Sequence, residues 1–403
     1  MLAFIVIGLI FITSSLIYLI KEGNIEKETI PTVKQDGISE VTDKAEDETQ
    51  NQNENKESSS VGNDNQGNEQ NDDTDVDGEA EAELEEEIED EIAMVFTGDI
   101  YIGNSVDSIY QSKGIGGVVS KGYREEFQLA DFVMINQEFP FSLRGEPMEN
   151  KQYTFRVKPD RVSLLQDLNV SIVSLANNHT LDYGMDAFLD TLQVLEEAEI
   201  EYAGAGRNLS EAKTTKYFDI KGKTIAVLSA SRVIPVTDWN ATNTKGGLFT
   251  TYDPTALLQE IEIAREQADY VIVYVHWGIE KNEYPEEYQR TMGKQYIDAG
   301  ADIVIGSHPH VLQGFEYYKG KPIVYSLGNF IFNPVATNTA IVKVTLDEEN
   351  NAKIQIMPGN TVAGYTKEYA EAEEIKKAYE YLESISYHVN IDNHGYLNRL
   401  LVE

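Results

Sequence analysis

Short apolar runs rich in valine and isoleucine recur along the chain from Ile92 onward, and segments with helical periodicity separate them. Such an alternation of strand and helix patterns is typical of an α/β domain. The predicted strands lie at residues 92–100, 131–138, 170–179, 224–230, 269–278, 301–310 and 321–330. The predicted helices lie near residues 158–168, 184–198, 254–267 and 286–299.

Two further strands, near residues 340–347 and 352–358, are expected to complete the sheets. Residues 366–385 have the pattern of a C-terminal helix. We therefore expect a folded domain at residues 93–360 and a C-terminal helical extension at residues 361–403.

The first twenty residues contain no charged side chain and are long enough to cross a bilayer as one helix. We interpret residues 1–20 as a transmembrane anchor. A cleaved signal peptide is the alternative, but the apolar run is long for one and no A-x-A-like cleavage site closes it. Only Lys21 flanks the run, so the positive-inside rule says almost nothing about its orientation. The absence of cysteine fits an exported protein and also a cytosolic one.

Residues 21–92 are rich in Asn, Gln, Ser, Asp and Glu and contain hardly an aromatic side chain. Such a segment cannot bury enough apolar surface to offset its ordering entropy, so we expect a disordered acidic linker. It carries about 26 acidic side chains and about 5 lysines, hence about −21 of the formal net charge of −37. Most of the acidity of the chain therefore belongs to the predicted linker.

Carboxylate, amide and imidazole side chains lie at the ends of the predicted strands of the α/β domain. The ends of these strands carry Asp99, Asn136, Glu138, Asn178, His179, His276, His308 and His310. In open α/β sheets, ligands bind at the carboxyl ends of the strands, where the loops converge. A single histidine is more often a surface or core residue, but five strand ends with this chemistry indicate one common site.

Carboxylates, an amide oxygen and neutral imidazoles together suit a divalent ion such as Zn²⁺, Mn²⁺ or Fe²⁺. A strand would direct His308 and His310, two residues apart, to opposite faces. Either one of them lies beyond the strand end, or the turn at Pro309 directs both inward.

The motifs "TGDI", "NQE", "SLANNHTLDYG", "VHWGIE", "GSHPHVLQG" and "YSLGNF" resemble those of the CapA/PgsA proteins of poly-γ-glutamate capsule biosynthesis. The resemblance covers residues from about 94 to about 360. That family is in turn similar to calcineurin-like metallophosphatases. The resemblance thus implies a four-layer αββα metallophosphatase-like sandwich with one or two metal ions at the strand ends, preceded by the membrane helix and the acidic linker.

Matched position by position, the resemblance implies a metal-ligand set and a catalytic histidine. The implied ligands are Asp99, Glu138, Asn178, His276, His308 and His310. His179 matches the histidine that protonates the leaving group, and Asp182 is a candidate to orient it. Asp182 is equally well placed to be the N-cap of the following helix.

Two positions depart from the metallophosphatase pattern. Tyr101 stands where the Asp-x-His motif has its histidine, and Glu138 replaces an aspartate. Loss of one imidazole weakens one of the two metal positions, so the second ion is expected to be loose or absent.

The resemblance favours a membrane-anchored, single-pass protein whose globular domain is extracytoplasmic and takes part in poly-γ-glutamate synthesis or export. Its expected partners are the membrane, poly-γ-glutamate or a cell-wall polymer, and other membrane proteins of a capsule synthesis complex. Two alternatives are a metal-dependent hydrolase of phosphate esters or γ-glutamyl and cell-wall amide bonds, and a binding module with a vestigial metal site. Nucleic acid is not expected as a partner, because the folded part is acidic and has no basic stripe.

Overall fold

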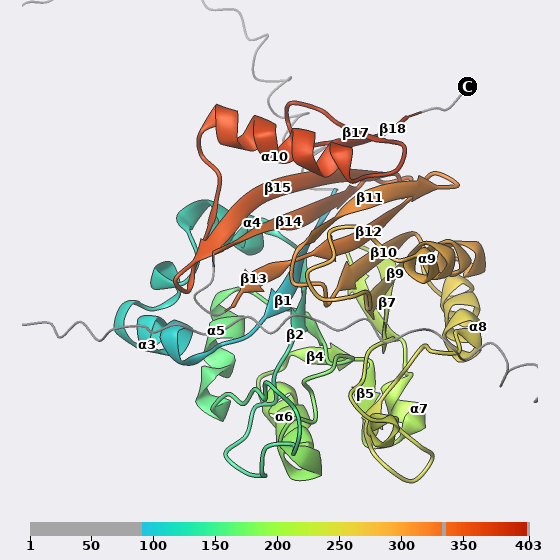
Figure 1. The fold of residues 1–403 in the computed structure, drawn as a ribbon. Helices are drawn as coiled ribbons and strands as arrows, with labels where there is room; N and C mark the ends of the chain where they lie inside the picture. The colour runs from blue at the N-terminus through green and yellow to red at the C-terminus, as the bar shows by residue number, and fades with distance from the viewer. Residues whose placement is uncertain (1–90, 333–335, 401–403) are drawn as a thin grey trace, which may run out of the picture. The chain divides into compact units, whose positions relative to one another are not determined.

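The structure is a computed structural model that describes residues 91–332 and 336–400 (Figure 1). The predicted transmembrane anchor at residues 1–20 lies outside this part of the chain. So does the predicted linker at residues 21–92, apart from its last two residues. Among the helices described, none has the length and apolar character needed to cross a membrane.

In the described part of the chain, eight strands form the first sheet. In spatial order they are β16 (Tyr365–Glu368), β15 (Ala352–Val362), β14 (Thr337–Leu346), β1 (Ile92–Ile100), β2 (Phe132–Gln137), β3 (Ile172–Ser174) and β4 (Glu201–Ala203), with β13 (Asn329–Ile331) beside the end of β1. β1 to β4 are mutually parallel, whereas β14, β15 and β16 continue the sheet in antiparallel pairs. The parallel half therefore ends at one common edge.

A second sheet contains six of the described strands. Their spatial order is β11 (Leu312–Tyr318), β12 (Lys321–Leu327), β10 (Ile303–Ser307), β9 (Tyr270–His276), β7 (Lys223–Ser231) and β6 (Lys216–Ile220). β12, β10, β9 and β7 are parallel, and an antiparallel strand closes each side. Two small pairs are β5 (Ala205–Gly206) with β8 (Gly247–Leu248), and β17 (Val389–Ile391) with β18 (Leu397–Arg399).

Helices cover the outer face of each sheet. The described helices are α3 (Asn104–Lys113), α4 (Lys121–Leu129), α5 (Val162–Asp167), α6 (Gly184–Glu197), α7 (Leu209–Ala212), α8 (Thr255–Arg265), α9 (Glu287–Ala299) and α10 (Ala372–Ser384), with short 3₁₀ turns η1 (Ile115–Gly117), η2 (Pro159–Arg161) and η3 (Thr237–Trp239). Buried side chains of α3 to α6 form one hydrophobic cluster with the first sheet. Those of α8 and α9 form another with the second sheet.

The two sheets pack face to face on a third hydrophobic cluster. Along β1, Met94 and Phe96 point into this inter-sheet cluster, whereas Val95 points to the helices. Successive side chains of a strand face opposite sides, so a strand covered on both faces must be apolar at nearly every position. The resulting order of layers is helix, sheet, sheet, helix. The predicted mixed α/β fold is confirmed.

The C-terminal segment differs from its predicted pattern. The helix expected at 366–385 begins at Ala372, because residues 365–368 form β16. Ala363 and Gly364 both have positive φ angles, of 54° and 80°, and reverse the chain between β15 and β16. Leu382 and the strands β17 and β18 then pack on the inter-sheet cluster. The segment after residue 360 therefore completes the sandwich.

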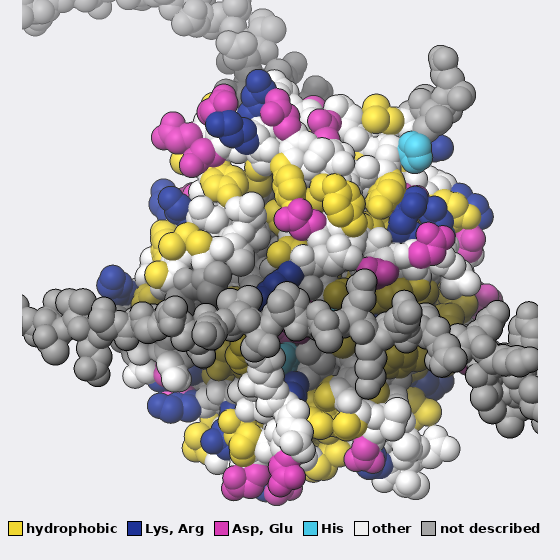
Figure 2. All heavy atoms as spheres, viewed as in Figure 1, with side chains coloured by type: hydrophobic (Ala, Val, Ile, Leu, Met, Phe, Trp, Pro, Cys, Tyr) yellow, Lys and Arg dark blue, Asp and Glu magenta, His cyan; other side chains and the backbone are white. Residues whose placement is uncertain are grey.

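On the parts of the face that grey atoms leave visible in Figure 2, Lys and Arg side chains lie among Asp and Glu side chains.

Candidate metal centre

The site is built around a close contact between two glycines, Gly98 of β1 and Gly328 between β12 and β13. A Cβ atom on Gly98 would lie 1.9 Å from the carbonyl oxygen of Gly328, so no larger residue fits. Gly328 has a φ of 66°, which glycine adopts without strain. The backbone N of Asp99 donates to Gly328 O over 2.9 Å. The motifs "TGDI" and "SLGNF" thereby bring Asp99 beside Asn329 in the register of β1 and β13.

Asp99 and Glu138 supply two fully buried carboxylates. Asp99 lies where the register between β1 and β2 shifts, and Glu138 directly follows β2. Asn136 Nδ2 donates to Asp99 Oδ1 over 2.8 Å. Burial raises the pKa of Glu138 well above its ordinary range, and the charge of Asp99 raises this pKa further. Two neighbouring carboxylates in such surroundings are both ionised only beside a cation.

His276, the last residue of β9, faces Asn178 and Glu138 across the site. Its Nε2 lies 2.8 Å from Asn178 Oδ1 and 3.2 Å from Glu138 Oε1. Its Nδ1 lies 3.0 Å from Ser307 Oγ. Burial lowers the pKa of His276 well below its ordinary value, and the neighbouring His308 lowers it further. The neutral imidazole is the form that binds a metal ion.

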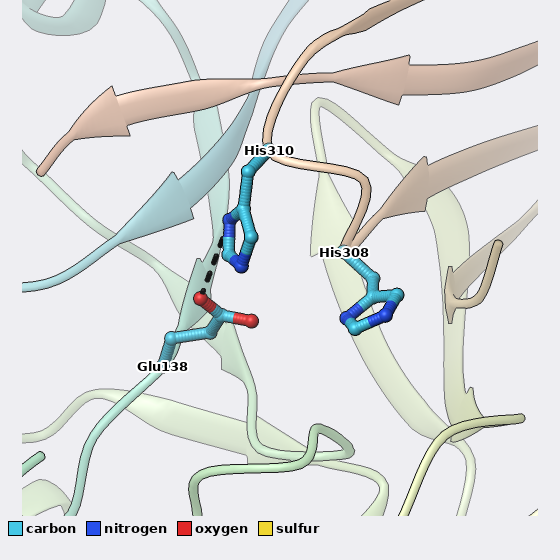
Figure 3. A group of neighbouring side chains, drawn as sticks. All are labelled: Glu138, His308 and His310. Atoms are coloured by element: carbon cyan, nitrogen blue, oxygen red, sulfur yellow. Dashed lines mark ion pairs between the residues drawn. The ribbon is translucent and has the colours of Figure 1, made fainter. Parts of the chain in front are cut away.

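His308 and His310 both lie beyond the end of β10, which finishes at Ser307. Their φ angles are 100° and 58°, so the chain leaves the strand geometry that would direct them to opposite faces. The turn directs both inward: His310 Nδ1 lies 3.1 Å from Asp99 Oδ2, and the ring centroid of His308 lies 4.7 Å from that of His276. Figure 3 shows the imidazole of His310 beside the carboxylate of Glu138, with His308 next to them.

These two imidazoles differ in charge. Burial lowers the pKa of His308 to about 3, so this side chain is neutral. Burial also disfavours the charged form of His310, but the carboxylates of Glu138 and Asp99 outweigh it and raise the pKa of His310 to about 10. Without another cation, a protonated His310 thus balances part of the buried negative charge.

The donor atoms of the site fit a divalent ion. Both carboxylate oxygens of Glu138 and the Nδ1 of His308 are buried and have no hydrogen-bond partner within the described part of the chain. One donor atom from each of Glu138, His308 and His310 lies within 4.8 Å of the others, and the same holds for Asp99, Glu138 and His276. Glu138 belongs to both groups. Carboxylate and imidazole donors, with the Asn178 amide oxygen beside them, suit Mn²⁺, Zn²⁺ or Fe²⁺.

His179 and Asp182 form a hydrogen-bonded pair next to this donor set. His179 Nδ1 lies 2.6 Å from Asp182 Oδ2, and the backbone N of Phe155 donates to the same oxygen over 2.7 Å. Helix α6 has Tyr183 at its N-cap, so Asp182 does not cap it. Burial lowers the pKa of His179, against the opposing effect of Asp182.

Tyr101 lies in a stack of rings that leads to His179. Its ring is stacked on Phe155 with centroids 4.0 Å apart, and Phe155 is stacked on the imidazole of His179, also at 4.0 Å. The residue that replaces the expected histidine is therefore separated from the imidazole of His179 by the ring of Phe155. Burial raises the pKa of the Tyr101 hydroxyl, and the nearby Tyr183 and Asp182 raise this pKa further.

The structure brings all the sequence-predicted site residues to one region, and it adds two that the predicted set lacks. Lys151 forms an ion pair with Asp182, donates to Asn178 O and lies 3.1 Å from His179 Nδ1. Asn329 Oδ1 lies 2.8 Å from His310 Nδ1. Asn329 stands in the "SLGNF" motif, but the loop around Lys151 has no pattern that signals a site.

Comparison with known proteins places this fold and site in a family. Residues 93–334 match the family described as bacterial capsule synthesis protein PGA_cap. The chain is 34% identical over 276 residues to the PGA biosynthesis protein CapA of Bacillus subtilis, which covers 67% of this chain and 72% of that protein. It is 32% identical over 303 residues to the capsule biosynthesis protein CapA of Bacillus anthracis, which covers 73% of each chain.

Similarity to solved structures is weaker. A hypothetical protein from Thermus thermophilus superposes with a TM-score of 0.42 at 15% identity, over 69% of this chain and 100% of that one. The match over residues 93–334 covers more than half of the sequence and contains Asp99, Glu138 and the histidines of the site. The chain belongs to the bacterial capsule synthesis family PGA_cap.

Proposed function

We propose that the protein is a membrane-anchored, extracytoplasmic component of poly-γ-glutamate capsule synthesis or export that depends on a divalent metal centre. The observation that carries the proposal is the convergence of unpaired buried donors from both sheets, above all the two oxygens of Glu138. An uncompensated buried carboxylate is costly, whereas a metal ligand needs its oxygens free. Membership of a capsule synthesis family supplies the biological setting.

In this proposal one or two ions of Mn²⁺, Zn²⁺ or Fe²⁺ are held by the predicted ligand set. The ligands are Asp99, Glu138, Asn178, His276, His308 and His310. Glu138 is the residue placed to contact both positions, since it belongs to both donor groups. When bound, a divalent ion supplies Lewis-acid polarisation of a substrate oxygen. The αββα layers and this ligand set together support a metallophosphatase-type site.

The residues of the chain itself have separate tasks. Asn136 and Asn329 orient the inner carboxylate and one imidazole, through contacts of 2.8 Å to Asp99 Oδ1 and His310 Nδ1. Asp182 holds the Nδ1 side of His179, which leaves Nε2 as the atom that accepts or releases a proton.

A second candidate function is hydrolysis of a phosphate ester or of a γ-glutamyl or cell-wall amide bond. The buried His179–Asp182 pair favours it, because a scaffold has no need for an imidazole oriented by a carboxylate. The two functions are compatible, since a synthesis component can also trim or release its polymer.

Anchoring and partners are part of the same proposal. The uncharged first twenty residues support a single membrane span, and the acidic residues 21–92 support a linker that holds the domain away from the bilayer. The proposed partners are the polymer and the other membrane proteins of a capsule synthesis complex.

Complementation of a deletion strain tests the proposal. Strains that carry the full chain should display surface polymer, and strains that carry a His308→Ala/His310→Ala variant should not. A His394→Ala variant, which changes an exposed histidine outside the site, is the matched control. Normal polymer from the double variant, expressed at the level of the wild type, would remove the metal centre from the proposed function.

A further inference from the structure

The backbone of Arg232 is hydrogen-bonded to that of His276, a residue of the candidate metal centre, and its guanidinium lies against two tyrosine rings. It follows Ser231, the last residue of β7, and its backbone N donates to His276 O over 2.8 Å. The Cζ atom of its guanidinium is 4.7 Å from the ring centroids of both Tyr252 and Tyr288. At this distance the ring faces attract the cation and limit its movement.

Both rings are held by the loops that surround the metal centre. Tyr288 OH accepts a hydrogen bond of 2.7 Å from Gly278 N. Gly278 in turn lies close to Pro309, the residue between His308 and His310 in the sequence, since a Cβ atom on Gly278 would lie 3.0 Å from it. Tyr252 OH accepts from Ile234 N over 3.2 Å. The place of the guanidinium is therefore set before any ligand binds.

The guanidinium of Arg232 has neither a carboxylate partner nor a hydrogen-bond acceptor among the residues that the structure describes. Its Nε is buried and unpaired. Among the other described arginines, the exposed Arg399 also has no side-chain partner, whereas Arg124 and Arg156 donate to backbone carbonyls. Those that pair with carboxylates are Arg144, Arg161, Arg207, Arg265 and Arg290. The formal net charge of the chain is −37. A guanidinium that still has no carboxylate partner among the described residues is a site where an anion from another molecule can bind.

We propose that Arg232 is an oxyanion-binding residue of the metal centre, which takes a second carboxylate or phosphate group of the molecule that the centre binds. The ring contacts leave the N–H edge of the guanidinium for hydrogen bonds, and this edge matches two oxygens of one group. The proposal rests on the proposed metal centre, and it extends that site toward the flank formed by β7 and α9.

A polymer with one free carboxylate per unit suits such a pair of positions, because one group can lie at the centre while the next reaches Arg232. The positive charge of Arg232 also reduces the repulsion between the protein and an anionic polymer. An acidic protein repels a polyanion, so contact requires fixed local cations. A phosphate ester that carries a further anionic group would use the same two positions.

Calorimetric titration of the full chain, loaded with Mn²⁺, tests the proposal with two probes. One is a γ-linked glutamate trimer, and the other is propane-1,3-diyl bisphosphate, which carries a second phosphate for the position at Arg232. Arg232→Gln should weaken binding of the recognised probe by about 10- to 100-fold, the range for loss of hydrogen bonds to a charged group. Arg232→Lys, which keeps the charge but not the planar edge, should give a smaller loss. Arg124→Gln is the matched control, since this arginine lacks a carboxylate partner and lies on α4.

The outcomes separate this proposal from that of the metal centre. Loss confined to the trimer identifies a carboxylate subsite, loss confined to the bisphosphate identifies a phosphate subsite, and loss of both supports the shared chemistry. Affinities of Arg232→Gln within about twofold of the wild type for both probes, at unchanged melting temperature, overturn the proposal. Elemental analysis reports the metal independently. If the chain takes up no metal, the proposed function fails, while the comparison of Arg232→Gln with the wild type still decides the role of Arg232.

Discussion

His179 and Asp182 lie with Nδ1 and Oδ2 2.6 Å apart, and both side chains are buried. The carboxylate is itself fixed, by the backbone N of Phe155 and by the ion pair with Lys151. An imidazole oriented in this way keeps its Nε2 in one direction. The same pair is a means of distinguishing an enzyme from a scaffold.

His179→Ala should retain the metal and lower the rate of hydrolysis by about 10²- to 10⁴-fold, the usual contribution of a general acid. The reason is that His179 is not among the proposed ligands, whereas its Nε2 is the proposed proton donor. Assays with phosphate-ester and γ-glutamyl substrates measure the rate, and elemental analysis measures the metal. A metal-loaded variant with the rate of the wild type would exclude the catalytic role of His179.

Glu138→Gln should weaken binding of the divalent ion by at least about 10-fold, because even changes to residues that only support a ligand commonly have effects of this size. Glu138 is a sharp test of the ligand set, since its two oxygens have no hydrogen-bond partner in the described structure, and the two imidazoles near them, of His276 and His310, are themselves proposed ligands. Titration with Mn²⁺ measures the affinity. His394→Ala should bind as the wild type does, and equal affinity of Glu138→Gln and this control would contradict the assigned ligand set.

The sequence predicted the fold best where strands are buried on both faces. β1 and β9 have apolar residues at nearly every position, and their predicted ranges of 92–100 and 269–278 match or closely bracket the observed strands. The strand pattern failed for β11, which contains a glycine, a glutamine and a glutamate and pairs antiparallel with β12. Its buried polar side chains, such as Glu316, have hydrogen-bond partners that are distant in sequence. The local sequence pattern therefore cannot predict that these side chains are buried.

For the site, the sequence predicted which residues lie close together but not the conformation of the loops that carry them. Asp99 and His276 end strands, so their place followed from the strand pattern. The inward direction of His308 and His310 depends on the positive φ angles of these two residues. The residue types at these positions do not predict such angles. Lys151 was not predicted at all, because a lysine in a polar loop ordinarily faces solvent.

Lys151→Met should lower the free energy of unfolding by about 1–3 kcal/mol, since it leaves the buried Asp182 without the lysine that forms its ion pair. The same change should reduce hydrolysis, because the carboxylate that orients His179 is less well held. Urea denaturation and the hydrolysis assay measure the two effects. Lys158→Met, at an exposed position of the same segment, is the control, and equal stability of the two variants would contradict the role of Lys151.

Glu316 offers a test of stability as a function of pH, at a distance from the metal ligands. Its carboxylate is nearly buried and accepts from Arg290 over 3.1 Å and from Tyr325 OH over 2.7 Å, with Lys294 Nζ 2.8 Å away. Burial acts to raise the pKa of Glu316, but these donors outweigh it and lower the pKa from the ordinary 4.5. The charged form is thus stabilised by folding.

A carboxyl group whose pKa is lower in the folded state contributes stability that is present above the unfolded pKa and is lost as the pH falls through the folded pKa. Glu316→Gln should therefore lower the free energy of unfolding by about 1–3 kcal/mol at neutral pH, and the difference from the wild type should shrink below a pH of about 4.5. Urea denaturation at pH 7 and at successively lower pH measures it. Glu373→Gln, at an exposed i,i+4 pair with Lys377, should change stability by less than about 0.5 kcal/mol at any pH. A difference between Glu316→Gln and the wild type that stays constant with pH would show that shape, and not the charge of Glu316, holds this network.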